Sequence, residues 1–467
     1  MAEPRPPSPS DEKTTERFVD RVIERQKEAI LQACRNRDLD ALRDLAESRG
    51  GFLTDELRAQ AWPVLLGLSP PHPKPKDAQD DDASVPDWKT LPRHRDEDQV
   101  QLDVNRAFTY YPNDQTDAQL THIKSLLSDL IVSLLRLHPY LCYFQGYHDI
   151  AQVLLLTLPA SLHLPALTRL SLFHIRDFML PSLAPAIAQL RLLPEILRLA
   201  DPPLYRHLAR LEPFFALSGT LTMYAHDVPS RDVIARLFDA LLAREPVFSV
   251  YLFAAIVRAR RDELFDTPAE DTDMLHFILS KLPSSLDVDG LITQAAQLFS
   301  EVPPERLPSW KKGVSKWSVL KTERFALQLT GKEINHGSEG EKDGGPNGPT
   351  LPPPFYSSST SRKKWLELDL VPIPVSQARV WFDKHVAELR RREQRDKAVQ
   401  WLRKNRRPAG LVGLAVLVGV LAVVVQYYSQ QQGRLPAPVA AGLGMVERLA
   451  KMAGRRGEGP WWPSLWR

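Results

Sequence analysis

The sequence predicts an all-α fold, with a large helical domain followed by one membrane-spanning helix. Between Leu120 and about residue 300, apolar residues recur at helical spacing, prolines separate the runs, and the alternating pattern of strands is scarce. A second apolar run, Pro408–Val425, contains no polar side chain. Apolar residues make up 43% of the 467 residues, which is enough to build a sizeable core.

The N-terminal elements are predicted from helical spacing and from the residues that interrupt it. Residues 1–48 are expected to form an N-terminal tail and a helical segment, which the pair Gly50-Gly51 stops. Thr54 then stands at the N-cap of the next helix. The main helical domain is predicted to extend over residues 49–332, with a Pro-, Lys- and Asp-rich surface loop from Ser69 to Val85.

The composition changes after this domain. Residues 333–375 are rich in Gly, Ser and Pro, which predicts a flexible linker. Residues 376–407 are predicted to form a basic amphipathic helix. Its thin apolar stripe would consist of Val380, Val386, Leu389, Val399 and Leu402.

Residues 408–428 are predicted to be a transmembrane anchor. As a helix, the apolar run would rise roughly 27 Å, which just spans a hydrocarbon core. A buried core helix is the alternative, but this segment is apolar on every side. Nine Lys or Arg residues lie from Arg390 to Arg407, so the positive-inside rule places the large N-terminal domain in the cytosol and residues 429–467 on the far side. So short a span favours the endoplasmic reticulum membrane.

Charge and cysteine content argue against several functional classes. The formal net charge of +3 gives no reason to expect a nucleic-acid partner. Two widely separated cysteines predict neither a disulfide framework nor a metal site. No phosphate-binding P-loop occurs, so the chain is not itself a GTPase. Cys142, His148 and Asp149 lie too close together on one short segment to form a nucleophile, a base and an orienting group.

Two short motifs carry the predicted chemistry: Leu102–Arg106 and Tyr143–Ile150. The guanidinium of Arg106 is always charged, and its forked donors match phosphate oxygens. The carboxamide of Gln145 has both an acceptor for a water proton and a donor for a phosphate oxygen. An arginine and a glutamine on one helical domain are therefore suited to completing the hydrolysis of a nucleotide held by another protein.

Four motifs together resemble the TBC domain family of Rab GTPase-activating proteins, in that family's order over roughly residues 50–310. Three features depart from its usual pattern: Ala107 replaces the threonine that follows the arginine, the proline usual three residues after the arginine is absent, and Phe238 replaces a tryptophan. The four motifs are Arg58–Gly67, Asp103–Arg106, Tyr143–Gly146 and Arg236–Asp239.

The resemblance implies a role for each site residue. Arg106 would be an arginine finger and Gln145 a glutamine finger, the two catalytic residues supplied in trans to a Rab GTPase. Asp103 lies one helical turn before Arg106 and would hold the guanidinium, while Tyr143 and Gly146 would shape the loop. The chain would activate a GTPase without independent enzymatic activity. It would need no cofactor of its own, because the Rab partner carries GTP and Mg²⁺.

The extension Tyr147–Ile150, together with the anchor, is similar to the branch of the family that is anchored in the endoplasmic reticulum, which implies a Rab of endoplasmic-reticulum-to-Golgi traffic. One rival function is a membrane-anchored scaffold that binds a Rab without catalysis. A second is a membrane-shaping protein that works through residues 376–467. Arg58 and Asp239 are predicted to be structural ion-pair partners, and Trp62 to be a core residue.

Overall fold

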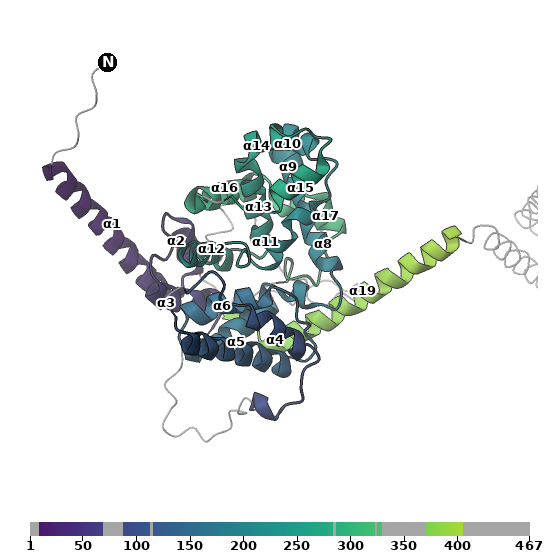
Figure 1. The fold of residues 1–467 in the computed structure, drawn as a ribbon, viewed down its shortest axis with the longest axis horizontal. Helices are drawn as coiled ribbons and strands as arrows, with labels where there is room; N and C mark the ends of the chain where they lie inside the picture. The colour runs from purple at the N-terminus through teal and green to yellow at the C-terminus, as the bar shows by residue number, and fades with distance from the viewer. Residues whose placement is uncertain are drawn as a thin grey trace, which may run out of the picture. The chain divides into compact units, whose positions relative to one another are not determined.

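The structure is a computed structural model that describes residues 9–68, 87–112, 115–283, 286–322, 325–328 and 369–404. Helices make up nearly all of it (Figure 1), so the helical class predicted for the main domain is confirmed. The chain divides after Ala387 into two compact units. The helices between residues 9 and 312 all belong to the first unit.

The elements of the first unit follow one another closely along the chain. The N-terminal half contains α1 (Pro9–Asn36), α2 (Leu39–Glu47), α3 (Asp55–Leu65), η1 (Trp88–Thr90), α4 (Glu97–Asn105), α5 (Asp117–Leu137), α6 (Tyr147–Thr157), α7 (Ala160–Phe173), η2 (Arg176–Met179), α8 (Ala184–Leu190) and α9 (Leu192–Ala200). Next come α10 (Pro202–His207), η3 (Pro213–Ala216), α11 (Leu217–Leu221), α12 (Arg231–Ala243), α13 (Phe248–Ala259), α14 (Arg261–Phe265), α15 (Thr272–Leu279), α16 (Val288–Glu301), η4 (Pro304–Arg306) and α17 (Pro308–Lys312).

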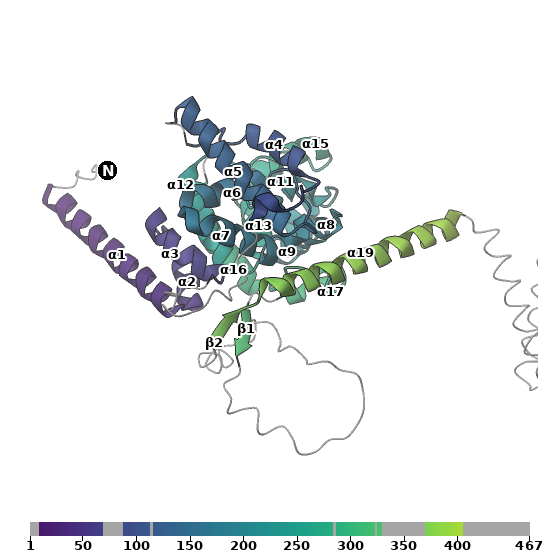
Figure 2. The ribbon, with the colours of Figure 1, turned by 90° about the horizontal axis from the view of Figure 1, so that it is seen from below.

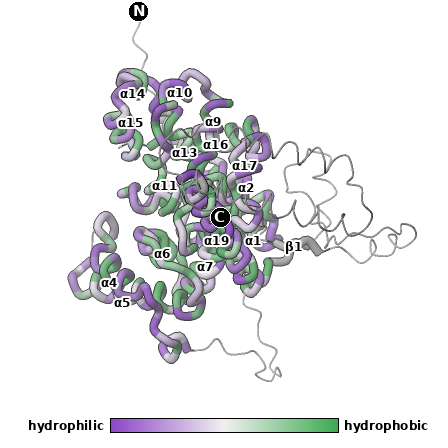
Figure 3. The backbone as a smooth tube through the Cα atoms, turned by 90° about the vertical axis from the view of Figure 1, so that its right-hand side faces the viewer, coloured by the Kyte–Doolittle hydropathy of each residue, from purple (hydrophilic) through white to green (hydrophobic). Residues whose placement is uncertain are grey.

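The core of the first unit includes a helix, α13, that is apolar on nearly every side. α13 packs along α16, and nearly all its residues are buried, as expected for a helix without a polar face. Figure 3 shows that α6 and α13 are largely hydrophobic. In Figure 1, α4, α5 and α6 lie together in one part of the unit, with α11 and α12 between them and the group α9, α10 and α13–α15.

The N-terminal helices pack onto the same unit. α2 lies against α12 and α16, and α1 lies against α3. Thr54 occupies the N-cap of α3 as predicted, although its side chain makes no hydrogen bond to the helix backbone. Helices α1 and α2, which the sequence places in a separate segment before residue 49, therefore pack against helices of the main domain.

A buried carboxylate, Asp239 on α12, holds α3 in place. It is fully buried, and its oxygens accept hydrogen bonds from Arg58 Nε at 3.1 Å, Trp62 Nε1 at 2.8 Å and the Phe52 backbone N–H at 3.1 Å. Burial raises the pKa of Asp239, and the Arg58 charge with these donors opposes that rise. The predicted Arg58–Asp239 pair is confirmed, and Trp62, which has no exposed surface, is a core residue as expected.

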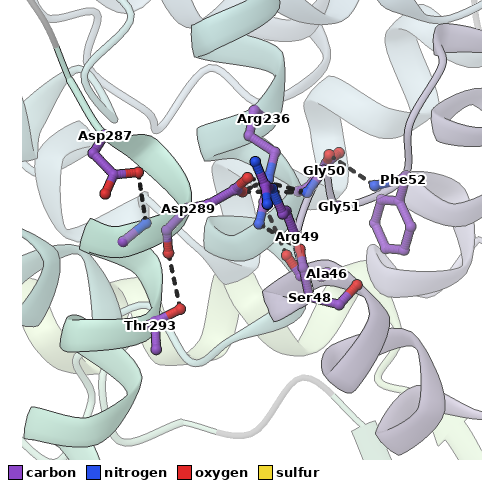
Figure 4. Close-up of polar contacts among 12 residues, drawn as sticks. Ala46, Ser48, Arg49, Gly50, Gly51, Phe52, Arg236, Asp287, Asp289 and Thr293 are labelled. Atoms are coloured by element: carbon purple, nitrogen blue, oxygen red, sulfur yellow. Dashed lines mark hydrogen bonds and ion pairs between the residues drawn. The ribbon is translucent and has the colours of Figure 1, made fainter. Parts of the chain in front are cut away.

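Arg236, three residues before Asp239, fixes the turn between α2 and α3. Its guanidinium donates to Asp289 Oδ1, the Ala46 carbonyl and the Ser48 carbonyl, each at 2.8 Å. Figure 4 shows Arg236 between Asp289 of α16 and this turn. The Arg236–Asp239 motif therefore supplies both the cation and the anion that join α12 to the N-terminal segment.

Two short strands add to the predicted all-α fold. β1 (Phe325–Gln328) pairs antiparallel with β2 (Asp369–Pro372), as Figure 2 shows. β2 lies within residues 333–375, where the composition predicts a flexible linker, so the linker prediction is wrong for these four residues. Strands of four residues are too short for a periodic signal. The two strands are also separated by some forty residues of the chain.

The basic helix α19 (Val375–Lys404) begins one residue before its predicted start. Its predicted apolar stripe is wrong, because Val380 and Val399 are 41% and 44% exposed. The buried residues of its first turns are instead Ala378, Phe382 and His385. The spacing of aliphatic residues does not predict this buried face, because its partners on the domain are aromatic and polar groups such as Tyr140 and Asp177.

The predicted membrane anchor, residues 408–428, and the tail, residues 429–467, lie outside the described residues. Across the part of the chain that the structure describes, every helix is too short or too polar to cross a bilayer.

We expect Arg58→Met to lower the free energy of unfolding by about 3–5 kcal/mol, because it leaves the Asp239 carboxylate buried without its charged partner. Urea denaturation of the purified protein measures this loss. The exposed Lys27–Glu24 pair provides the control, since Lys27→Gln should cost less than about 1 kcal/mol. Equal losses in the two variants would contradict a structural role for the buried pair.

Candidate functional site

Arg106 stands at the C-terminal end of α4, where the helix presents it to solvent. Its backbone N–H closes the last turn by donating to the Asp103 carbonyl at 3.0 Å. The side chain is 70% exposed, and its Nη2 lies 3.5 Å from Asp103 Oδ1. The guanidinium is therefore held near one carboxylate while most of its surface stays open.

Asp103 is the centre of the site. The carboxylate is only 2% exposed, and it faces donors from two segments. Oδ1 accepts from Gln99 Nε2 at 2.9 Å, and Oδ2 accepts from the Tyr143 hydroxyl at 3.0 Å. Burial, followed by the nearby Asp103 charge, raises the pKa of Tyr143, so the phenol keeps its proton and remains a donor.

The segment between α5 and α6 carries Gln145, and several backbone contacts fix it. The Tyr143 N–H donates to Asp96 Oδ2 at 2.9 Å, and the Cys142 N–H donates to the Met179 carbonyl at 2.9 Å. Gln145 itself is exposed, and no hydrogen bond joins its carboxamide to another described residue. A rigid loop thus presents a free carboxamide two residues after Tyr143.

Gly146 ends this loop at the N-cap of α6. Its φ is +93°, a conformation that glycine adopts without strain. A Cβ at this position would lie 2.6 Å from Thr222 Cγ2. The glycine is therefore required both by the turn and by the close approach of the segment after α11.

A histidine–carboxylate cluster next to this loop was not predicted as part of the site. Asp149 Oδ2 lies 2.8 Å from His226 Nδ1, and Asp149 Oδ1 lies 3.4 Å from His148 Nε2. Burial lowers the pKa of His148, whereas the hydrogen bond to Asp149 raises the pKa of His226. The only signal in the sequence was the adjacent His148-Asp149 pair, because His226 comes from a distant segment.

The structure brings Asp103, Arg106 and Tyr143 into one network. His148 Nδ1 lies 3.4 Å from the Tyr143 hydroxyl, so the histidine cluster adjoins the same network. Cys142 is engaged elsewhere, since its Sγ accepts from Arg95 Nη2 at 2.9 Å, and burial raises the pKa of its thiol. The Cys142 thiol therefore contacts an arginine, whereas His148 and Asp149 belong to the cluster around His226.

Within the described residues, no group of His, Cys, Asp or Glu side chains is arranged to hold a metal ion. A pocket of about 570 Å³ opens beside the start of α16, and none of the five predicted site residues lines it. Its carboxylates already serve the fold: Asp287 caps Gly290 N–H, and Asp289 binds Arg236 (Figure 4). The pocket lining consists of Arg49, Asp287, Asp289, Gly290, Thr293 and Gln294.

Comparison with known proteins agrees with the motifs at this site. Residues 55–265 match the family model for the Rab-GTPase-TBC domain. GTPase-activating protein gyp10 of Schizosaccharomyces pombe is 35% identical over 303 residues, which cover 64% of this chain and 79% of gyp10. The chain therefore belongs to the Rab-GTPase-TBC domain family.

Two further proteins and one crystal structure are also similar to this chain. TBC1 domain family member 20 of Mus musculus is 36% identical over 274 residues, which cover 58% of this chain and 65% of that protein. GTPase-activating protein GYP8 of Saccharomyces cerevisiae is 28% identical over 254 residues, 48% of each chain. The crystal structure of the Ypt/Rab-GAP domain of Gyp1p aligns with a TM-score of 0.42 at 18% identity, over 56% of this chain and 92% of that chain.

We expect Gly146→Ala to destabilise the protein by about 1–3 kcal/mol, because alanine is strained at this φ and its Cβ collides with Thr222. Thermal unfolding measures the change. The double variant Gly146→Ala/Thr222→Ser lacks the colliding methyl but retains the hydroxyl that donates to the Ser218 carbonyl. It should recover only the part of the loss caused by the collision, and a full recovery would contradict backbone strain.

The His226–Asp149 pair predicts a pH-dependent stability. The hydrogen bond to Asp149 raises the folded-state pKa of His226 above the ordinary histidine value of about 6.5, so its stabilising effect is complete below that pH and is lost as the pH rises through the raised pKa. The unfolding temperatures of wild type and His226→Asn should therefore differ most near about pH 6 and converge by about pH 9. In an Asp149→Asn background the His226 substitution should have no such pH dependence. A constant difference across this range would contradict the ion pair.

Proposed function

We propose that this protein is a GTPase-activating protein for a Rab GTPase, in which Arg106 and Gln145 complete the partner's active centre. One observation carries the proposal. The exposed Arg106 guanidinium shares the buried Asp103 carboxylate with Tyr143, and Tyr143 lies two residues before the exposed Gln145. Family membership and the names of the similar proteins support the same class of activity.

The chemistry of the two side chains fits the needs of this reaction. Negative charge develops around the γ-phosphate as GTP is cleaved, and a guanidinium neutralises it through forked hydrogen bonds. The carboxamide of Gln145 orients the attacking water. For small GTPases in general, an arginine supplied in trans is worth about 10³–10⁵ in kcat. Nothing in this scheme requires a cofactor on this chain, because GTP and Mg²⁺ enter with the Rab.

The supporting residues would keep the arginine finger in position before the Rab binds. Asp103 restrains the guanidinium without covering it, and the Tyr143 hydroxyl and Gln99 amide fix the carboxylate. Such an arrangement costs little reorganisation when the partner arrives. Gly146 supports the approach of the loop to the Rab by allowing the sharp turn after Gln145.

We further propose that the protein is anchored in the endoplasmic reticulum membrane and acts on a Rab of endoplasmic-reticulum-to-Golgi traffic. The sequence supports this through the apolar run Pro408–Val425, the Lys/Arg residues before it and the Tyr147–Ile150 extension. The positive-inside rule places the catalytic domain in the cytosol. A panel of purified Rabs assayed with the full chain would identify the partner.

We expect Arg106→Ala and Gln145→Ala each to lower the rate at which this protein stimulates GTP hydrolysis by the Rab, by about two orders of magnitude or more. Single-turnover hydrolysis with the detergent-solubilised full chain measures the rate. Both side chains are exposed, and Asp103 keeps its hydrogen bonds from Gln99 and Tyr143 when Arg106 is replaced, so the unfolding temperature should change little. Arg198→Ala on α9 and Gln297→Ala on α16 are matched controls, because both replace exposed residues outside the site.

The same assay separates catalysis from simple binding. Unaltered turnover in either finger variant would refute the two-finger mechanism. A wild-type protein that binds a Rab but stimulates no hydrolysis would instead indicate a membrane-anchored, non-catalytic scaffold.

A further inference from the structure

The loop that carries Gln145 rests on a helix more than two hundred residues later in the chain. Tyr140 begins this loop and packs against Phe382 of α19, with ring centroids 4.9 Å apart at 64°. Arg379 lies about one turn before Phe382 on α19. Its guanidinium lies over the Tyr140 ring, 4.3 Å from the ring centroid. Burial raises the pKa of Tyr140 to about 12, which is consistent with a ring covered by this helix.

One face of the first turns of α19 is almost completely buried. Ala378, Phe382 and His385 are 0%, 4% and 2% exposed, and their spacing places them on one helical face. Trp381 adds an edge-to-face contact with Phe173 of α7, with centroids 6.3 Å apart. This part of α19 therefore belongs to the core of the first unit.

A buried carboxylate, Asp177, contacts the same turns. Asp177 Oδ1 lies 3.6 Å from His385 Nδ1 and accepts the Val319 N–H at 3.0 Å, while Oδ2 accepts from Gln189 Nε2 at 2.9 Å. Asp177 follows the fully buried Arg176, whose guanidinium lies 5.5 Å from the Trp381 ring. Asp177 lies two residues before Met179 in η2. The Met179 carbonyl accepts a hydrogen bond from the Cys142 N–H of the Gln145 loop.

We propose that residues 375–387 of α19 act as a brace that positions the Gln145 loop, with Tyr140 and Phe382 as the positioning residues. The loop is then held from two sides: Asp96 and Asp103 bind it from α4, and α19 packs against its beginning. The brace lies more than a hundred residues beyond residue 265, where the match to the family model ends. This inference rests on the proposed function, because positioning matters only if Gln145 acts on a nucleotide.

The test uses the full chain and two readouts. Phe382→Ala should raise hydrogen exchange at the Cys142 and Tyr143 amides, which are hydrogen-bonded in the intact loop. It should also lower the maximal stimulated rate of GTP hydrolysis by the Rab by about tenfold or more, since small misplacements of catalytic groups have large effects on rate. The Rab concentration that gives half-maximal rate should change less than about twofold, because the interface itself is intact. Phe382→Leu should restore most of the rate.

Two further variants keep the result interpretable if Phe382→Ala folds poorly. Arg379→Gln removes the cation over Tyr140 from a half-exposed position and should change both readouts in the same direction, by less. Phe299→Ala is the matched control: Phe299 is also 4% exposed and packs against Phe248 and Tyr251. It should lower the unfolding temperature without changing the loop amides or the maximal rate.

Unchanged amide exchange in Phe382→Ala, or raised exchange with an unchanged maximal rate, would overturn the brace while leaving the finger mechanism intact. The same effects in Phe299→Ala would also overturn it, because they would reflect general loosening. If the wild-type chain stimulates no Rab, the proposed function fails and the brace loses its catalytic role, whatever the exchange shows.

Discussion

The geometry of the candidate site depends on the burial of one negative charge. A carboxylate that leaves water is tolerated only when donors replace its hydration. Asp103 meets this requirement with Gln99 from its own helix, Tyr143 from the α5–α6 loop, and the nearby Arg106 guanidinium. Because these donors come from two segments, the carboxylate can be satisfied only when α4 and the loop are correctly placed. The cost of burying Asp103 is thus what aligns the two proposed fingers.

The same principle recurs elsewhere in the helical unit. Asp239 collects donors from α3 and the turn before it. Asp177 collects donors from α8 and from the segment after α17, and its Oδ1 lies 3.6 Å from His385 Nδ1 of α19. Each of these aspartates is almost completely buried, and each joins segments more than a hundred residues apart. Aliphatic packing supplies the bulk of the core, but it is not directional. Buried carboxylates supply the direction, and a misplaced segment would leave one of them unsatisfied.

The sequence could predict features set by local spacing or by a recognised motif. The helical class and the Arg58–Asp239 pair were predicted, and the structure confirms both. Asp103, Arg106 and Tyr143 do lie in one network, although their catalytic role stays a prediction. The contribution of His226 was not predicted, because only the folded chain brings it to Asp149. Strands β1 and β2 were missed because four residues give no periodic signal.

The packing of α19 shows why long-range contacts escape such reasoning. The stripe proposed from its aliphatic residues points to Val380 and Val399, yet Phe382 and His385 are the buried residues. A helix buries whichever face meets complementary groups, and here those groups are an aromatic ring and an aspartate on the domain. Neither Tyr140 nor Asp177 can be predicted as a partner from the sequence of α19 alone. The chemistry of a site is therefore easier to predict from sequence than its mechanical support, because catalytic side chains fall in short motifs whereas their supports are set by the tertiary fold.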